Sequence, residues 1–139
     1  VKQSFPQAGS SFKPFIYSAA IANGYKASDT INDAPIIFED QNLESAWRPE
    51  NYTGKFYGPI RLREALVQSV NIVSIKLLRE LGIDKAHTFL ENFGFPKSRL
   101  APDLSLALGS SSFSPAEMIR AYNFLANSGE GKNLYFKDY

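Results

Sequence analysis

After residue 58, apolar residues recur at steps of three and four positions, a spacing that collects them on one face of an α-helix. This pattern predicts helices over residues 62–69, 72–81, 83–93 and 114–127. Gly82 and Gly94 follow the second and third of these stretches and are expected to end them. Residues 12–23 are mixed apolar and small and end at Gly24, which predicts a further, buried helix.

The last of these helices has the clearest boundary signals. Ser114 is a preferred N-cap residue, and Pro115 suits the first helical position. Glu117 stands where its side chain can close a capping box with Ser114. Gly129 is placed to end the helix, so both boundaries are predicted from side-chain chemistry.

Residues 25–60 have a different character. They contain three prolines and two glycines, and only residues 35–38 are typical of a strand. Irregular stretches of this length in a compact domain either serve a function or hide short elements. We therefore expect four to six helices and at most short strands.

Charge and composition exclude several classes of protein. The 15 Lys and Arg residues nearly balance the 14 Asp and Glu residues, and like charges form no run that would attract nucleic acid. The absence of cysteine excludes a disulfide framework and a thiolate zinc site, and the one histidine, His87, cannot form a histidine metal cluster. We expect no metal, no cofactor and no nucleic-acid partner, and we interpret His87 as a partly exposed packing residue.

A potential nucleophile and a potential base stand close together near the start of the chain. Ser10 and Lys13 are three positions apart, so they share one face if this stretch is helical. A serine hydroxyl needs an adjacent base, and a lysine amine that is desolvated can lose its proton near neutral pH. The pair alone is weak evidence, because surface helices often contain both residues.

A second polar pair, Ser69 and Asn71, falls in the turn between two predicted helices. Such a turn can direct both side chains into a cleft. The alternative is an ordinary helix cap, in which Ser69 or Asn71 accepts hydrogen bonds from free N–H groups of the helix that follows.

Both pairs lie within longer segments that resemble one family. Residues 8–15 (Ala-Gly-Ser-Ser-Phe-Lys-Pro-Phe) resemble the first active-site motif of class A, or bifunctional, penicillin-binding proteins. Residues 62–71, which end in Ser-Val-Asn, resemble the second motif, and the order of the two motifs also agrees. The resemblance continues through residues 47–52, 106–110 and 114–118.

The family's third motif, Lys-Thr/Ser-Gly, does not occur in this sequence. We therefore expect residues 1–139 to be the N-terminal part of a penicillin-binding transpeptidase domain, truncated before that motif. The resemblance implies an α+β fold like that of penicillin-binding proteins and serine β-lactamases. This chain would supply mainly the helical lobe, would leave apolar surface where the sheet packs, and would be inactive alone.

The resemblance also implies roles for single residues. Ser10 resembles the nucleophile that attacks a D-Ala-D-Ala stem peptide of peptidoglycan, and Lys13 resembles the base. Ser69 resembles a hydroxyl that relays a proton, and Asn71 an amide that binds the substrate. The implied partners are the stem peptides, β-lactam antibiotics and the remainder of the domain. The implied location is the periplasmic side of the inner membrane, in a membrane-anchored protein.

Two other functions share this chemistry. A serine β-lactamase would need an additional base that hydrolyses the acyl-enzyme, but Glu39, Glu44 and Glu50 all precede Ser69, where we do not expect one. A penicillin-binding sensor module would be acylated and would remain acylated.

Pro14 creates a conflict at the proposed nucleophile. Proline disfavours a helical conformation at Lys13, and its missing N–H would leave the Ser10 carbonyl unpaired in an α-helix that began earlier. Propensity therefore starts the helix near Pro14, whereas the resemblance places Ser10 on the first turn. We expect a distorted turn at this point.

Overall fold

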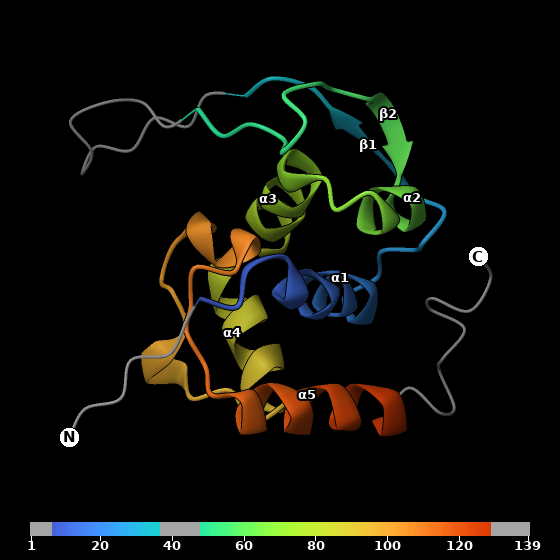
Figure 1. The fold of residues 1–139 in the computed structure, drawn as a ribbon. Coiled ribbons are helices and arrows are strands. Elements are labelled where there is room, and N and C mark those ends of the chain that lie inside the picture. The colour runs from blue at the N-terminus through green and yellow to red at the C-terminus, as the bar shows by residue number, and fades with distance from the viewer. Residues whose placement is uncertain (1–6, 37–47, 129–139) are drawn as a thin grey trace.

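The computed structural model describes residues 7–36 and 48–128, which form a set of packed helices with a small sheet at one edge (Figure 1). The α-helices are α1 (Lys13–Ala22), α2 (Leu62–Val67), α3 (Asn71–Leu81), α4 (Ile83–Glu91) and α5 (Pro115–Ser128). Short 3₁₀ segments lie at Gly9–Phe12 (η1), Lys97–Arg99 (η2) and Leu104–Leu108 (η3), and the strands are β1 (Thr30–Asp33) and β2 (Gly58–Arg61). All the helices predicted from periodicity are present, close to their predicted bounds.

Helix α1 occupies the centre of the fold, as the sequence predicts. Most of its side chains are buried, including Lys13 at its first position. Ala19 and Ala20 are fully buried, and their small side chains let α3 and α4 pack closely against α1. A helix that is apolar on all sides is stable only inside a core, so α1 is the support on which the other helices are placed.

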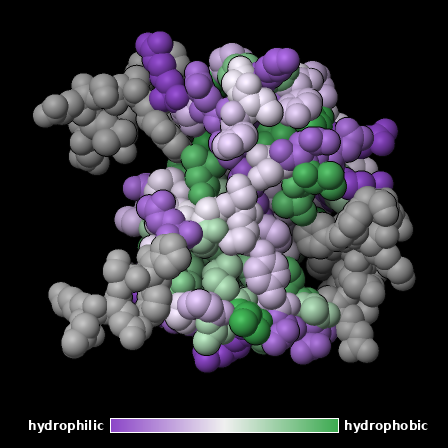
Figure 2. All heavy atoms as spheres, in the orientation of Figure 1, coloured by the Kyte–Doolittle hydropathy of each residue, from purple (hydrophilic) through white to green (hydrophobic). Residues whose placement is uncertain are grey.

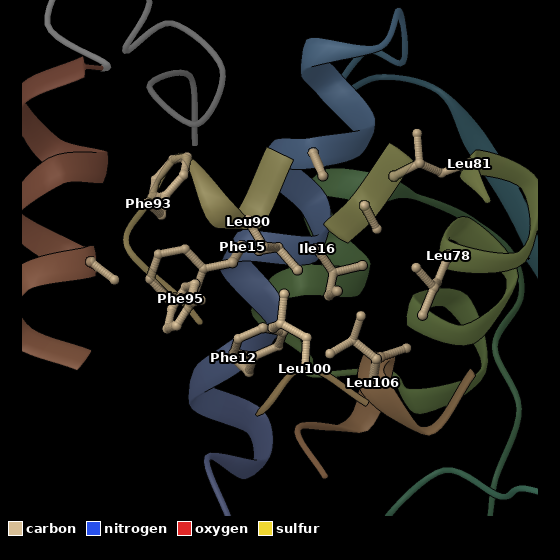
Figure 3. Close-up of a cluster of buried hydrophobic side chains, with 14 of the residues drawn as sticks. Phe12, Phe15, Ile16, Leu78, Leu81, Leu90, Phe93, Phe95, Leu100 and Leu106 are labelled. Carbon is tan, nitrogen blue, oxygen red and sulfur yellow. The ribbon is translucent and has the colours of Figure 1, made fainter. Parts of the chain in front are cut away.

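A cluster of phenylalanine rings anchors the segment that leads into α1. Phe12 stacks on Phe113 with ring centroids 5.9 Å apart, and Phe95 lies 4.6 Å from Phe113. Phe15 contacts Phe93 and Phe95 edge to face. Figure 3 shows the rings of Phe12, Phe15, Phe93 and Phe95 gathered beside the aliphatic residues of α3 and α4. Each fully buried ring contributes about 1.5–3 kcal/mol, so burial of Phe12 fixes the turn between Ser10 and Lys13.

A second buried cluster joins α1 to α2 and α3. Tyr17 of α1 packs with Leu62 of α2 and with Val73 and Leu77 of α3, and all four side chains are buried. This packing holds the α2–α3 turn over the start of α1. Apolar packing alone therefore brings α1 and the α2–α3 turn together, although they are far apart in the sequence.

The sheet lies in the region that the sequence predicts as irregular. Strands β1 and β2 are antiparallel, with Thr30 opposite Arg61 and Asp33 opposite Gly58. The strand predicted at residues 35–38 is wrong where it can be tested, because Pro35 and Ile36 lie outside both strands; residues 37 and 38 are outside the described part. The apolar stretch 35–38 was expected to form the strand, but the strand is the mostly polar segment Thr30–Asp33. It pairs with β2, which lies far away in the sequence.

Helix α5 begins with the predicted capping box. The Ser114 N–H donates to Glu117 Oε1 at 2.8 Å, and the Glu117 N–H donates to Ser114 Oγ at 3.1 Å. Glu117 also forms an ion pair with Arg99. Gly129, the predicted end of this helix, lies outside the described residues.

Part of the surface of α5 is apolar. Ile119 is 62% exposed and Phe124 45% exposed. Figure 2 shows apolar atoms among polar ones along the lower edge, where Figure 1 places α5. The expectation that a sheet packs on apolar surface of this chain stays a prediction. Across residues 7–36 and 48–128, no helix has the length and apolar character needed to cross a membrane.

Candidate active site

Ser10 lies on the distorted turn that the Pro14 conflict predicts. Residues Gly9–Phe12 form the 3₁₀ segment η1, and α1 begins only at Lys13. The Lys13 N–H donates to the Ser10 carbonyl, so the missing N–H of Pro14 leaves that carbonyl paired. The Ser10 side chain is exposed and makes no hydrogen bond within the described residues. Its hydroxyl is therefore open to an incoming molecule.

Lys13 is only 2% exposed, and its amine points at the α2–α3 turn. Its Nζ lies 2.8 Å from the Ser69 carbonyl oxygen, 3.0 Å from Ser69 Oγ and 2.6 Å from Asn71 Oδ1. Three of the four residues predicted for the site are thus joined by direct hydrogen bonds. Ser10 precedes Lys13 by one short helical turn.

The turn itself has an unusual backbone. Ser69 has φ 54°, the one positive φ at a residue other than glycine in the described part of the chain. The Ser69 N–H donates to Leu66 and the Val70 N–H to Ala65, which ends α2 and directs the Ser69 carbonyl toward Lys13. A side chain in this conformation costs about 1–2 kcal/mol, which the surrounding contacts must offset.

Burial lowers the pKa of the Lys13 amine from its ordinary value of 10.5 to about 8. The physical cause is the loss of hydration around the charged form. With a pKa of about 8, roughly a tenth of the molecules hold a neutral amine at pH 7. Lys13 can therefore serve as a base at physiological pH.

The partners of Lys13 suit both of its protonation states. An ammonium group has three N–H donors, and the structure offers three acceptors. A neutral amine has two donors and a lone pair. The Ser69 carbonyl and Asn71 Oδ1 can only accept, whereas the Ser69 hydroxyl can turn and donate to Nζ. A proton can thus pass between Lys13 Nζ and Ser69 Oγ by rotation of the hydroxyl hydrogen, while the heavy atoms of both side chains stay in place.

A pair of glycines supports the backbone around Ser10. The Gly9 N–H donates to the Gly109 carbonyl at 2.9 Å, and the Ala8 N–H donates to the Ser111 carbonyl at 2.9 Å. A Cβ on Gly109 would lie 2.1 Å from the Gly9 oxygen, and Gly109 has φ 73°, so only glycine fits there. Residues 106–110, quoted above for their resemblance, therefore support the turn that carries Ser10.

The interpretation of Ser69 and Asn71 as ordinary helix caps is wrong. The N-cap position of α3 is Val70, which makes no side-chain cap, and the Ile72 N–H donates its hydrogen bond to Asn51 Oδ1 at 3.0 Å. Asn71 is instead held by Lys13 on one side and by the Glu50 carbonyl, 2.9 Å from its Nδ2, on the other.

Sequence reasoning missed Asn51 and its partner Asp33, both of which are buried. The available signal was weak: Asn51 lies in the segment 47–52 noted for its resemblance, and Asp33 stood in a region predicted as irregular. Trp47 is outside the described residues. His87 is a packing residue, as expected, but it is buried and not partly exposed, with Nε2 2.8 Å from the Ala101 carbonyl oxygen.

The described residues contain no group of His, Cys, Asp and Glu side chains that could hold a metal ion. The chemistry available at the site is that of a hydroxyl nucleophile, a buried amine and a hydrogen-bonded amide. Nucleophilic acyl transfer uses this combination of groups.

Residues 2–138 match the family model of the penicillin binding protein transpeptidase domain, and the chain belongs to this family. Penicillin-binding protein 1A of Pseudomonas aeruginosa is 50% identical over 133 residues, which cover 96% of this chain and 16% of that protein. Penicillin-binding protein 1A of Escherichia coli is 42% identical over 127 residues, which cover 91% of this chain and 15% of that protein. The chain thus spans about a sixth of the length of these curated relatives, and the resemblance to class A proteins is confirmed.

Solved structures agree with the fold. The crystal structure of penicillin-binding protein 1A from Haemophilus influenzae has a TM-score of 0.86 and 42% identity, over 91% of this chain and 19% of that chain. The PonA1 protein of Mycobacterium tuberculosis in complex with penicillin V has a TM-score of 0.76 and 25% identity, over 91% of this chain and 36% of that chain. The predicted α+β penicillin-binding fold, with this chain as part of its helical lobe, is confirmed.

Proposed function

We propose that this chain carries the nucleophile and base of a peptidoglycan D,D-transpeptidase that forms an acyl-enzyme on Ser10. The observation that carries the proposal is the triple contact of Lys13 Nζ with Ser69 and Asn71, made by an amine whose pKa burial lowers to about 8. Ser10 is exposed and lies one turn before this amine, and the proposal requires Ser10 Oγ to come within hydrogen-bond reach of Nζ when the substrate binds.

In the first half of the proposed reaction, Ser10 Oγ attacks the carbonyl carbon of the penultimate D-Ala of a stem peptide. Neutral Lys13 takes the hydroxyl proton, and the Ser10 N–H provides half of an oxyanion hole. When the C–N bond breaks, the proton passes from Lys13 through Ser69 to the nitrogen of the leaving D-Ala. Asn71 holds the substrate's backbone with the second hydrogen of its NH₂ group, since the first is bonded to Glu50.

In the second half, an amine of a neighbouring stem peptide attacks the Ser10 ester. A new amide bond forms, and Ser10 recovers its proton along the reverse path. The Lys-Thr/Ser-Gly motif and the rest of the oxyanion hole would come from the remainder of the domain. The substrates are those of the cell wall, so we place the site on the periplasmic or outer side of the membrane, in a membrane-anchored protein.

A β-lactam imitates the donor peptide and acylates the same serine, which makes the proposal testable by mass. The full-length protein is incubated with a penicillin, and intact mass is measured for wild type, Ser10→Ala and Ser11→Ala. Ser11 is the matched control, since it is an adjacent exposed serine whose hydroxyl bonds to the Ala8 carbonyl. We expect an adduct of the whole penicillin on wild type and Ser11→Ala and none on Ser10→Ala.

Equal labelling of Ser10→Ala, or an unlabelled wild type, would contradict the assignment. The stability of the adduct separates the related functions. A transpeptidase holds the penicilloyl group for long periods and also forms cross-links from stem peptides, a β-lactamase releases the group rapidly, and a sensor forms no cross-links. The 139-residue chain alone, incubated in parallel, is expected to take no adduct.

A further inference from the structure

Asn51 is a buried amide whose hydrogen bonds all run to other parts of the fold. It is 6% exposed, and its Oδ1 accepts the Ile72 N–H at 3.0 Å. Its Nδ2 donates to the Lys55 carbonyl at 2.9 Å and to the Asp33 carboxylate at 2.8 and 2.9 Å. Every polar atom of the side chain is therefore satisfied.

Asp33 decides which way this amide points. The carboxylate is fully buried at the end of β1, and it accepts hydrogen bonds from Asn51 and from the Tyr57 N–H at 2.8 Å. An ionised carboxylate can only accept, so it draws the NH₂ group of Asn51 toward itself. The oxygen of the amide is thereby directed at Ile72. A buried carboxylate is costly unless it is hydrogen-bonded, so the pairing is strongly determined.

The contact with Ile72 reaches the candidate active site through one residue. Ile72 follows Asn71 in the first turn of α3, where the N–H groups have no partner within the helix. Glu50, which precedes Asn51, accepts a hydrogen bond from Asn71 Nδ2. The pair Glu50 and Asn51 therefore holds Asn71 and Ile72 at two points, one through a side chain and one through the backbone.

We propose that Asn51 and Asp33 are positioning residues for the transpeptidase reaction: Asp33 orients Asn51, and Asn51 fixes the start of α3 so that Asn71 and Ser69 meet Lys13. This inference rests on the proposed function. Both side chains are buried, so we expect neither to touch the substrate. Their effect reaches the reacting atoms through Asn71 Oδ1, which is 2.6 Å from Lys13 Nζ.

The carboxylate and the amide can be exchanged between the two positions, which gives a sharp test. Asp33→Asn places an NH₂ group against the NH₂ group of Asn51. Asn51→Asp places two carboxylates in contact in a buried space. In the double variant, the amide at position 33 can donate to the carboxylate at position 51 and accept from Tyr57, and the new carboxylate can accept from Ile72. The donor to the Lys55 carbonyl is lost, so this carbonyl must turn away from the new carboxylate toward solvent, which the exposed position of Lys55 allows.

The experiment uses the full-length protein and a fluorescent penicillin, and it measures the acylation rate constant separately from the binding that precedes it. Each single variant is expected to slow acylation by about ten- to a hundredfold, from misplacement of buried polar groups. The double variant is expected to return to within about threefold of wild type. Melting temperatures measured alongside show whether any loss is global unfolding.

Asp29→Asn is the matched control, because it makes the same chemical change in the turn before β1, where the carboxylate accepts the Lys26 N–H at 2.8 Å. It is expected to be acylated at the wild-type rate. Single variants that acylate like wild type would overturn the positioning role, as would a folded double variant no faster than the slower single variant. The proposed function fails separately, by absence of an adduct on Ser10 of the wild type.

Discussion

Lys13 Nζ lies 2.6 Å from Asn71 Oδ1, although 58 positions separate the two residues in the chain. Two hydrogen bonds to Ser69 accompany this contact. Apolar packing brings the segments together, because Tyr17 of α1 is buried against Leu62 and Val73. The candidate site is therefore a small set of hydrogen bonds that apolar packing holds in place, and substitutions can disturb the hydrogen bonds and the packing separately.

The first prediction concerns pH. The pKa of Lys13 is lowered to about 8, and the neutral amine is the base in the proposed reaction, so acylation by a penicillin should rise with pH around a midpoint near pH 8. An unperturbed lysine would give a midpoint near 10.5. The rate constant for acylation of the full-length protein, measured across this range, checks the midpoint.

Lys13→Arg is the matching variant. A guanidinium stays protonated throughout this range, so the variant should lose about 10²–10⁴-fold in acylation rate at every pH. A variant that kept a wild-type profile would show that Lys13 is not the base.

The second prediction separates the backbone of Ser69 from its hydroxyl. Ser69 has φ 54°, a conformation that glycine adopts without a Cβ penalty. Ser69→Gly and Ser69→Ala both remove the hydroxyl that contacts Lys13, so both should slow acylation by roughly a hundredfold. The glycine variant should be more stable than the alanine variant by about 0.5–1 kcal/mol in urea unfolding. Equal stability would show that the positive φ carries no strain.

The third prediction concerns the glycine that supports Ser10. A Cβ at Gly109 would lie 2.1 Å from the Gly9 oxygen, so Gly109→Ala must displace the η1 turn that carries Ser10. We expect both a lower melting temperature and slower acylation of the folded protein.

Gly24→Ala is the control for this substitution. Gly24 has φ 110°, but a Cβ there would meet no atom within 4 Å. The variant should lose about 1–2 kcal/mol of stability from backbone strain alone and keep its acylation rate. If both variants acylate at the wild-type rate, the contact between Gly9 and Gly109 does not position Ser10.

Much of the fold can be predicted from the sequence because most of its helices are local. The capping box at Ser114 and the terminating Gly82 depend on residues a few positions apart, and both are present. The Pro14 conflict could also be foreseen, and its resolution is a 3₁₀ turn that pairs the Ser10 carbonyl with the Lys13 N–H. The apparent conflict between Pro14 and a helix at Ser10 therefore pointed to the candidate active site.

The remainder depends on contacts that no local pattern encodes. Strand β1 is polar and pairs with β2, which contains Gly58 and Pro59, so each strand taken alone is typical of a loop. Asp33 and Asn51 are polar residues whose burial arises only when that sheet packs beside α3. Sequence reasoning therefore predicted the residues proposed to react and missed those that hold them in place.

The last prediction tests whether a purely structural interaction can be removed without effect on the site. Ser114→Ala deletes the hydroxyl that accepts the Glu117 N–H at the start of α5 and should cost about 1 kcal/mol of stability. Glu117 has its pKa lowered by its hydrogen bond to Arg99, so it stabilises the fold above its ordinary pKa of 4.5, and this stabilisation is lost as the pH falls through the lowered value. Glu117→Gln should therefore reduce the drop in unfolding free energy between pH 6 and pH 3. Both variants should acylate at the wild-type rate at pH 7, because α5 carries none of the groups that contact Lys13. Slower acylation in either variant, with the protein fully folded, would mean that the start of α5 is coupled to the Ser10 turn.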